Sequence, residues 1–470
     1  MKSLTTQTQT QTSRLSATTC PCYYYRRMAA TRTRAPSRPR WRNWARNQEC
    51  APSAIDLPAS EDELVAIVRA AAAAGQRVKA VGSGHSFTGA ALTDGRLLRL
   101  DNYQRILSTD REKLQVTVQS GIKLQRLYDE LWARGLALPN AGDIAYQSIS
   151  GAVSTSTHGT GRQFGGLATQ IAGLRLISGT GEVIDCSPDL EPQLFSAARV
   201  GLGALGIIST VTLQCVPAFH LRAQEGPMRV DQVLEDLDAH IAENEHFEFF
   251  WVPHTGWALT KRNNRTDEPA PGRGRWNEWR SDMLMGNYVF GALCRLGRLR
   301  PQSIPRIMRL LPGGGPVEYV DRGYRIFASP RKVRFYEMEY EIPIEAVKEA
   351  FGRVRQYIQD SGIMLSFPIE VRFTAADDIP LSTASGRASA YIAVHVFQGT
   401  QYQAYFEAVE DIMDDYGGRP HWGKLHFQTA ETLASRYPEW DRFQQVRARL
   451  DPEGRFSNPY LDRVLGPIGG

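Results

Sequence analysis

A glycine-rich turn with a histidine at its centre is the feature that most constrains this chain. The stretch Val81–Gly89 reads Val-Gly-Ser-Gly-His-Ser-Phe-Thr-Gly and follows a short strand-like segment at 77–80. Glycines let a backbone turn tightly with its N–H groups converging on one point, which is how loops hold phosphate oxygens. A phosphate site needs no imidazole, so His85 indicates a cofactor whose reactive ring lies nearby. The alternative is a plain strand-to-turn connection in which the histidine bonds to backbone.

The charge of the chain is unevenly placed. Residues 1–48 contain ten Lys and Arg and no Asp or Glu, whereas the formal charge of all 470 residues is +5. The other 422 residues therefore sum to −5. Because phosphate neutralisation needs a basic face on the folded part, this balance argues against nucleic-acid binding. The 42% hydrophobic content predicts a globular protein of two domains, and no apolar run approaches the length of a membrane span.

The first 40 residues predict a disordered basic tail, because Thr, Gln, Ser and Arg dominate and almost no aliphatic residue is present. Two alternatives remain: sequence upstream of a true start at Met28, and a transit-type peptide. The six cysteines are scattered without a CxxC pair. This pattern predicts reduced thiols in a cytoplasmic protein, with no disulfide framework and no structural zinc.

The sequence pattern changes near residue 218. Before that point the periodicity predicts helices over 56–75 and 124–134, strands at 78–81, 97–100, 115–118 and 207–214, and a hairpin over 171–185. After it, the pattern predicts aromatic strands at 247–252, 334–341 and 391–397, helices over 230–243, 344–360 and 402–416, and a loop over 262–280. We therefore expect an α+β fold, with a second domain inserted between the N-terminal half and the C-terminal tail.

Three further segments carry chemistry. In residues 147–161 small side chains dominate, so something large must approach this backbone closely. Glu370 and Arg372 lie two apart in a strand-like segment and share a face, either as a solvated ion pair or as a pair lining a cleft. In the segment 419–426, Lys424 presents an ammonium. A metal site from the two histidines of that segment lacks a third ligand nearby, so no metal is expected.

Taken together and in order, these segments closely resemble the aldonolactone and alditol oxidoreductases, a branch of the vanillyl-alcohol-oxidase type flavoproteins. The resemblance runs from about residue 43 to 465, and its most specific parts are the histidine loop, Thr-His-Gly-Thr-Gly at 157–161 and His-Trp-Gly-Lys at 421–424. It implies an FAD-binding domain over 41–217 that is completed by 417–470, and a substrate (cap) domain over 218–416. The FAD-binding residues that it implies are Val81, Gly82, Ser83, Gly84, His85, Ser86, Gly142, Asp143, Ser148, Gly151, Ser154, Thr157, His158, Gly159, Gly161, Gly206, Ile207, His421 and Lys424.

The resemblance also implies a reaction: oxidation of a CH–OH group of a sugar-derived lactone, of the L-gulono- or D-arabinono-1,4-lactone type. Hydride would pass to flavin N5, and oxygen or another acceptor would reoxidise the flavin, which His85 would hold covalently. The resemblance further implies that Glu370 bonds a substrate hydroxyl and holds Arg372, that Arg372 contacts substrate and flavin, and that Lys424 lies at the flavin. His395 and Glu337 match further pocket positions.

Two neighbouring residues bear on the electron acceptor and the substrate. Gly142 lies where relatives vary between glycine and alanine, and a glycine there is associated with oxygen access. Asp143 resembles the Gly-Asp form of the bacterial lactone enzymes, so the resemblance favours these over the alternative, an alditol oxidase acting on open-chain polyols. A catalytically inactive flavin-binding protein is the non-enzyme alternative.

Overall fold

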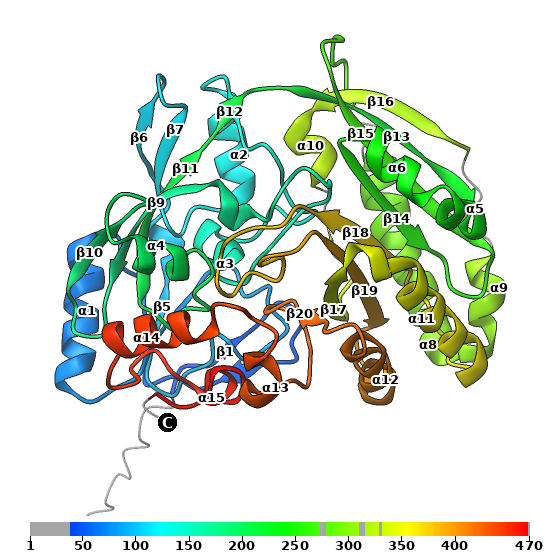
Figure 1. Cartoon of the computed structure of the whole chain (residues 1–470). Helices are drawn as coiled ribbons and strands as arrows, with labels where there is room; N and C mark the ends of the chain where they lie inside the picture. The colour runs from blue at the N-terminus through cyan, green and yellow to red at the C-terminus, as the bar shows by residue number, and fades with distance from the viewer. Residues whose placement is uncertain (1–37, 273, 275–278, 310–314, 329–330, 469–470) are drawn as a thin grey trace, which may run out of the picture. The chain divides into compact units, whose positions relative to one another are not determined.

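Five β-sheets and the helices packed on them make up the described part of the chain (Figure 1). The computed structural model describes residues 38–468 except 273, 275–278, 310–314 and 329–330. The tail predicted over 1–40 lies outside these residues apart from 38–40, which are exposed and without regular secondary structure. Among the described helices, none combines the length and the apolar character that a membrane crossing requires.

A three-stranded parallel sheet carries the glycine-rich turn. Its strands lie in the order β3-β5-β4, and the turn leaves the end of β4. Helix α1 begins later than the predicted residue 56, because residues 54–56 pair as a strand. Ser60 caps the helix by accepting a hydrogen bond from the Glu63 backbone N–H at 3.2 Å. The bounds are β3 (Ala54–Asp56), α1 (Glu61–Ala73), β4 (Val78–Val81), β5 (Arg96–Arg99) and the 3₁₀-helix η1 (Leu100–Asn102).

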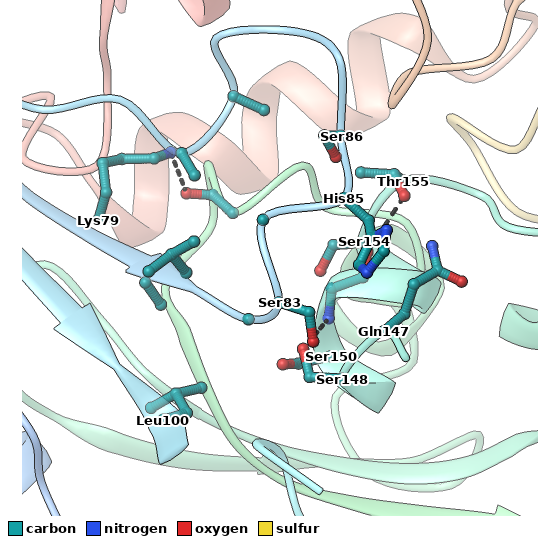
Figure 2. Close-up of a pocket in the computed structure, with 18 of the residues that line it drawn as sticks. Lys79, Ser83, His85, Ser86, Leu100, Gln147, Ser148, Ser150, Ser154 and Thr155 are labelled. Atoms are coloured by element: carbon teal, nitrogen blue, oxygen red, sulfur yellow. Dashed lines mark hydrogen bonds between the residues drawn. The ribbon is translucent and has the colours of Figure 1, made fainter. Parts of the chain in front are cut away.

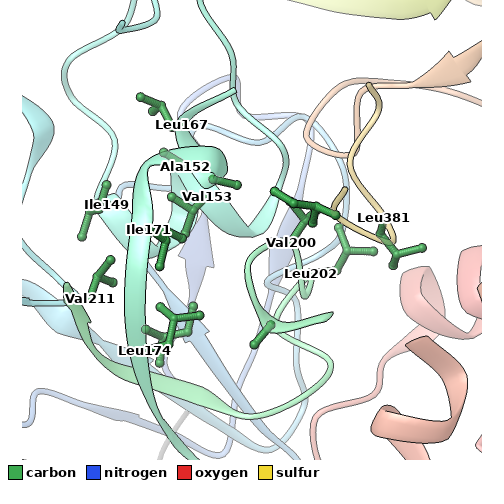
Figure 3. Packing of buried hydrophobic residues seen from close by; sticks show 14 of the residues in the cluster. Ile149, Ala152, Val153, Leu167, Ile171, Leu174, Val200, Leu202, Val211 and Leu381 are labelled. Carbon is green, nitrogen blue, oxygen red and sulfur yellow. The ribbon is translucent and has the colours of Figure 1, made fainter. Parts of the chain in front are cut away.

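A five-stranded antiparallel sheet follows in the sequence, with the order β10-β9-β11-β7-β6. It confirms the predicted hairpin over 171–185 and the strand over 207–214. Its apolar side packs on short helices, including α3 and α4, in the cluster that Figure 3 shows around Ile171 and Val211. The elements are β6 (Ile106–Asp110), β7 (Gln115–Gln119), α2 (Leu124–Trp132), β8 (Leu136–Ala137), α3 (Ile149–Ser154), η2 (Leu167–Gln170), β9 (Ile171–Ile177), β10 (Val183–Cys186), α4 (Pro192–Ala198), β11 (Ile207–Gln214) and β12 (Val216–Pro217).

An eight-stranded antiparallel sheet dominates the rest of the described chain, in the order β16-β13-β15-β14-β18-β19-β17-β20. Helices α5, α6, α11 and α12 cover one face and bury its apolar side chains. The strands are β13 (His220–Arg229), β14 (His246–Trp251), β15 (Trp257–Thr266), β16 (Val317–Arg322), β17 (Phe335–Pro343), β18 (Ile369–Thr374), β19 (Ser389–Phe397) and β20 (Arg419–Pro420). The helices are α5 (Val230–Glu235), α6 (Leu237–Glu243), η3 (Trp279–Val289), α8 (Phe290–Leu299), η4 (Pro301–Ser303), α9 (Ile304–Met308), α10 (Gly323–Phe327), η5 (Ile344–Ala346), α11 (Val347–Ser361) and α12 (Gln403–Asp414).

The side chains of β14, β17, β18 and β19 alternate between the two faces of this sheet. On β18, Ile369, Val371 and Phe373 join the core under the helices, so Glu370 and Arg372 point to the opposite face. The same alternation on β17, β19 and β14 directs acidic residues and two histidines to that opposite face. One face of the sheet is therefore a packed core, and the other carries buried charge.

The loop predicted over 262–280 is wrong at its described ends. Residues up to Thr266 continue β15, because all ten residues of that strand pair with β13 despite their charge. The π-helix η3 begins at Trp279. The helix predicted over 230–243 is divided at Asp236 into α5 and α6. In β15, tertiary pairing overrides local composition.

The C-terminal helices pack on the first half of the chain. Phe443 and Leu461 belong to the same hydrophobic cluster as Leu194 and Val211, and α14 contacts α4 (Figure 1). These elements are α13 (Ala430–Ala434), α14 (Trp440–Leu450) and α15 (Pro459–Leu465). Near the described N-terminus, β1 (Trp41–Arg42) pairs with β2 (Glu49–Cys50).

Candidate functional site

The turn after β4 lines a first cavity, which we call the loop cavity (Figure 2). It extends from His85 and Gln147 at one end to Lys79 and Leu100 at the other. Two segments distant in sequence, 147–155 and 202–208, complete its wall. It brings together ten of the predicted FAD-binding residues: Val81, Gly82, Ser83, Gly84, His85, Ser86, Ser148, Gly151, Ser154 and Gly206.

Two glycines give the turn its close fit. A Cβ on Gly82 would collide with the Ser148 hydroxyl, which itself accepts a hydrogen bond from Gly151 N at 3.3 Å. Gly84 has φ +67° and would place a Cβ 2.9 Å from the Trp41 ring. The turn backbone therefore lies directly on the start of α3, and no side chain larger than hydrogen fits between them.

His85 lies between two aromatic rings. Its imidazole stacks on Trp44, with the ring centroids 5.5 Å apart, and on Tyr146 at 6.4 Å. None of the residues described forms a hydrogen bond to either of its ring nitrogens. Burial, with the charges of Lys123 and Lys424, lowers the pKa of His85 to about 4. At neutral pH the ring is therefore uncharged and a nitrogen lone pair is available.

The charged face of the eight-stranded sheet lines a second cavity of about 840 Å³, which we call the charged cavity. Glu370 and Arg372 of β18 line it, so the cleft alternative for this pair holds, not the solvated ion pair. Gln147 lines both cavities, so they adjoin. The other predicted site residues that line this second cavity are Gly142, Asp143, Thr157, His158, Glu337, His395, His421 and Lys424.

Arg372 lies among three carboxylates, of which Glu248 and Glu370 are buried and Asp143 is partly buried. Its Nη2 is 2.6 Å from Asp143 Oδ2, and its Nε is 2.9 Å from Glu248 Oε2 and contacts Glu370 Oε1. These three carboxylates have the mutual spacing of a metal site, but the guanidinium contacts each of them. Arg331 adds a second cation at 3.0 Å from Asp143. The protein itself supplies the neutralising charge here.

The carboxylates of this cluster differ in pKa. Burial raises the pKa of Glu370 to about 7 against the opposing charge of Arg372, and the like charges of Asp143 and Glu248 add to the rise. Burial also raises the pKa of Asp143. The positive charges of Arg372, Lys261 and Arg331 outweigh this effect and lower the pKa of Asp143 to about 2. One acid of the cluster is therefore able to exchange a proton near neutral pH, while its neighbour stays ionised.

A second ion-pair cluster surrounds Lys424. Its Nζ contacts Glu337 and lies 4.0 Å from Glu339. His395 lies directly across from Glu337 in the β17–β19 pairing, with Nε2 at 3.3 Å from its carboxylate. Glu337 and Glu339 raise the pKa of Lys424 despite its burial, which keeps the ammonium charged. Burial lowers the pKa of His421 to about 3, so that ring is neutral.

Hydrogen bonds join the histidine turn to the segment that carries Lys424. The Phe87 N–H donates to Gly423 O at 2.7 Å, and Thr88 Oγ1 donates to Trp422 O at 3.2 Å. The His85 turn and Lys424 are thereby held next to each other although more than 300 residues separate them in the sequence.

Three predicted FAD-binding residues line neither cavity. Gly161 donates its N–H to Phe373 O at 2.7 Å, and a Cβ on Gly159 would collide with Ala141 O. Both glycines lie where this segment crosses other backbone. Ile207 is buried in the core beside α1, and its neighbour Ile208 lines the loop cavity instead.

The structure also reveals site residues that the sequence analysis missed: Lys79, Glu248, Lys261, Arg331 and Glu339. A charge within an apolar strand pattern was the available signal for Glu248, in Phe-Glu-Phe-Phe, and for Lys79, in Val-Lys-Ala-Val. The sequence offered no such signal for Arg331.

The chain is similar to known proteins over most of its length. The family model described as D-arabinono-1,4-lactone oxidase matches residues 211–464, just over half of the chain, and the one described as FAD binding domain matches 52–187. The L-gulono-1,4-lactone dehydrogenase of Mycobacterium tuberculosis is 49% identical over 91% of this chain and 100% of its own. The bovine L-gulonolactone oxidase is 36% identical over 91% of this chain and 98% of its own. A solvent-stable cholesterol oxidase structure matches the fold with a TM-score of 0.75 at 19% identity, over 91% of this chain and 97% of its own.

Proposed function

The chain belongs to the D-arabinono-1,4-lactone oxidase family, and from this membership we propose how its own residues oxidise a sugar-derived lactone. It is an FAD-linked oxidoreductase that acts on CH–OH groups of such lactones. When bound, FAD would supply the acceptor, flavin N5, for the hydride of the substrate carbon. The observation that carries the assignment is the charged cavity, which adjoins the glycine-lined loop cavity at Gln147.

The loop cavity suits FAD in shape and in the chemistry of its wall. The glycine backbone and serine hydroxyls offer hydrogen-bond donors to a phosphate-bearing chain. We place the flavin end at His85 and Gln147, since the catalytic cations lie beyond these residues. Val81–Ser86, Ser148, Gly151, Ser154 and Gly206 would contact the cofactor directly, whereas Gly159, Gly161 and Ile207 would support it from behind.

In the charged cavity we assign separate roles to the acids and the cations. Glu370 takes the proton from the substrate hydroxyl, because its pKa near neutrality allows it to accept one. Arg372 holds Glu370 and orients the substrate oxygen beside it. Lys424 stabilises the negative charge that hydride transfer places on the cofactor, and Glu337 with His395 holds Lys424 in position.

We further propose the domain boundaries and the location. The FAD-binding domain would comprise 41–217 and 417–470, and the cap domain 218–416; the packing of α13–α15 in the first hydrophobic cluster supports this division. The described cysteines Cys50, Cys186, Cys215 and Cys294 are free thiols, which suits the reducing environment of the cytoplasm.

We propose that His85 forms a covalent bond to the flavin. The neutral ring supports this, as does the lack of a hydrogen bond from any described residue to its nitrogens, because a nucleophilic attack needs a free lone pair. After acid denaturation, flavin fluorescence should stay with the wild-type polypeptide and be released from His85→Ala. Release from the wild type would contradict the bond and leave FAD binding intact.

Gly142 should control the access of oxygen. We expect Gly142→Ala to lower peroxide formation in air about tenfold or more, with little change in turnover by an artificial acceptor. The added Cβ would lie 3.0 Å from His158 O and would fill the cavity wall beside Asp143. Thermal melting must accompany the assay, since the His158 backbone has to shift slightly. An equal loss with both acceptors would show damage to the site and not a barrier to oxygen.

A substrate panel tests the function itself. The purified protein should be yellow and should oxidise L-gulono- or D-arabinono-1,4-lactone with kcat/KM above that for open-chain polyols. A preference for polyols would make it an alditol oxidase. A yellow protein that is inactive on both classes would favour a flavin-binding protein without catalysis, and a colourless protein that takes up no added FAD would overturn the proposal.

A further inference from the structure

Lys79 is a buried cation at the far end of the loop cavity from His85 (Figure 2). It lies on β4, is 2% exposed and lines the cavity together with Leu100, Gly203 and Ile208. A lysine in this position is costly to bury unless it binds something, because desolvation disfavours its charge.

The two hydrogen bonds of the Lys79 ammonium join distant parts of the chain. Its Nζ donates to Gly203 O at 3.0 Å and to Phe456 O at 2.9 Å. An ammonium has three N–H groups, so one remains after these two bonds. Both partners are neutral carbonyls, and among the described residues no carboxylate lies within ion-pairing distance of Nζ.

The charged groups that face Lys79 from neighbouring elements are already engaged. Asp451 accepts hydrogen bonds from the backbone N–H groups of Arg455 and Phe456, each at 2.8 Å, and Asp462 accepts one from Ser457 Oγ. Asp451 and Asp462 raise the pKa of Lys79, whereas the charge of Arg447 lowers it. Burial outweighs the two acids and lowers the pKa of Lys79 to about 7.

We infer that Lys79 is a binding residue for the ADP half of FAD: its third N–H donates to that half, and cofactor binding fixes the ammonium in its charged form. The inference rests on the proposed FAD cofactor. The flavin end is assigned to His85, so the diphosphate and adenosine extend toward Lys79 along the loop cavity. An anionic diphosphate nearby replaces the counter-charge that the protein does not provide.

Proton uptake on cofactor binding distinguishes this role from a purely structural role of Lys79. Because the free protein holds Lys79 partly neutral at pH 7 and above, binding of the ADP half must take up a proton. Affinity for FAD should then fall as the pH rises above 7, by up to about tenfold per pH unit. A lysine that only joined Gly203 to Phe456 would show no such link to the cofactor.

Reversible binding is measured in a His85→Ala background, which removes the proposed covalent bond. Calorimetry with FAD and with ADP, at pH 6 to 9 and in two buffers of different ionisation enthalpy, reports both affinity and proton uptake. We expect uptake in the parent, a Kd for FAD raised about tenfold or more without uptake in Lys79→Met, and binding without uptake in Lys79→Arg.

Each outcome decides the inference. Unchanged FAD affinity in Lys79→Met, or proton uptake that persists in either variant, overturns it. If Lys79→Met does not fold, the comparison of the parent with Lys79→Arg is sufficient, because arginine stays charged throughout this pH range. Folded parent protein that takes up no FAD at any pH overturns the proposed function and not merely the role of Lys79.

Discussion

Arg372→Lys should lower kcat/KM for the lactone by about 10²–10³-fold while the protein stays folded. The guanidinium of Arg372 reaches Asp143, Glu248 and Glu370 at once, and a lysine ammonium cannot reproduce that fork. Lysine nevertheless keeps a positive charge among the three acids. The measurement is steady-state kinetics with thermal melting of the same preparation.

Removal of the charge should have a second effect. Arg372→Ala leaves the carboxylates of Asp143, Glu248 and Glu370 without their shared cation, so we expect a loss of about 3–5 kcal/mol of stability in addition to activity. Arg353→Lys is the matched control for Arg372→Lys, because Arg353, on α11, makes an exposed ion pair with Asp415. If Arg372→Lys turned over at a rate near that of the wild type, the proposed role of Arg372 in the reaction would be wrong.

Glu370 should make the reaction depend on pH. Its pKa of about 7 means that it is protonated below this pH and accepts a proton only above it. The value of kcat/KM should therefore rise about tenfold per pH unit below 7 and level off above. We call the rising part of this pH profile, below pH 7, the limb. Because Glu370 and its neighbours interact strongly, the limb reports the titration of the whole cluster and not of Glu370 alone. The measurement is kcat/KM between pH 5 and 9.

Two substitutions test this assignment. Glu370→Gln should abolish the limb and lower kcat/KM by about 10²–10⁴-fold. Its melting temperature should not fall, because the substitution replaces a buried acid by a neutral group. Glu248→Gln should keep the limb but move it to lower pH, since Glu248 raises the pKa of Glu370. Glu345→Gln, at an exposed position of η5, should change neither property. A limb that survives Glu370→Gln would assign the proton transfer to another group.

The local sequence pattern was sufficient to predict the bounds of several helices and strands. Strands β4 and β11 have the predicted bounds, and α2 begins at the predicted Leu124. Strand β13 was missed, because its ten residues combine charged and small side chains without a clear alternation. It forms because β15 and β16 pair with both of its edges, which is information that lies outside its own sequence.

The sequence by itself determined which side chains share a face and at which positions the backbone needs glycine. The two-residue spacing of Glu370 and Arg372 places them together on any strand, and the Val81–Gly89 turn needs its glycines wherever it packs. Only the tertiary structure decided their chemistry. Burial and the approach of Asp143 and Glu248 set the proton affinity of Glu370, and the fold alone placed Lys79 at the end of a cavity. Desolvation and Coulomb energy depend on distance in space, which the order of residues along a chain does not specify.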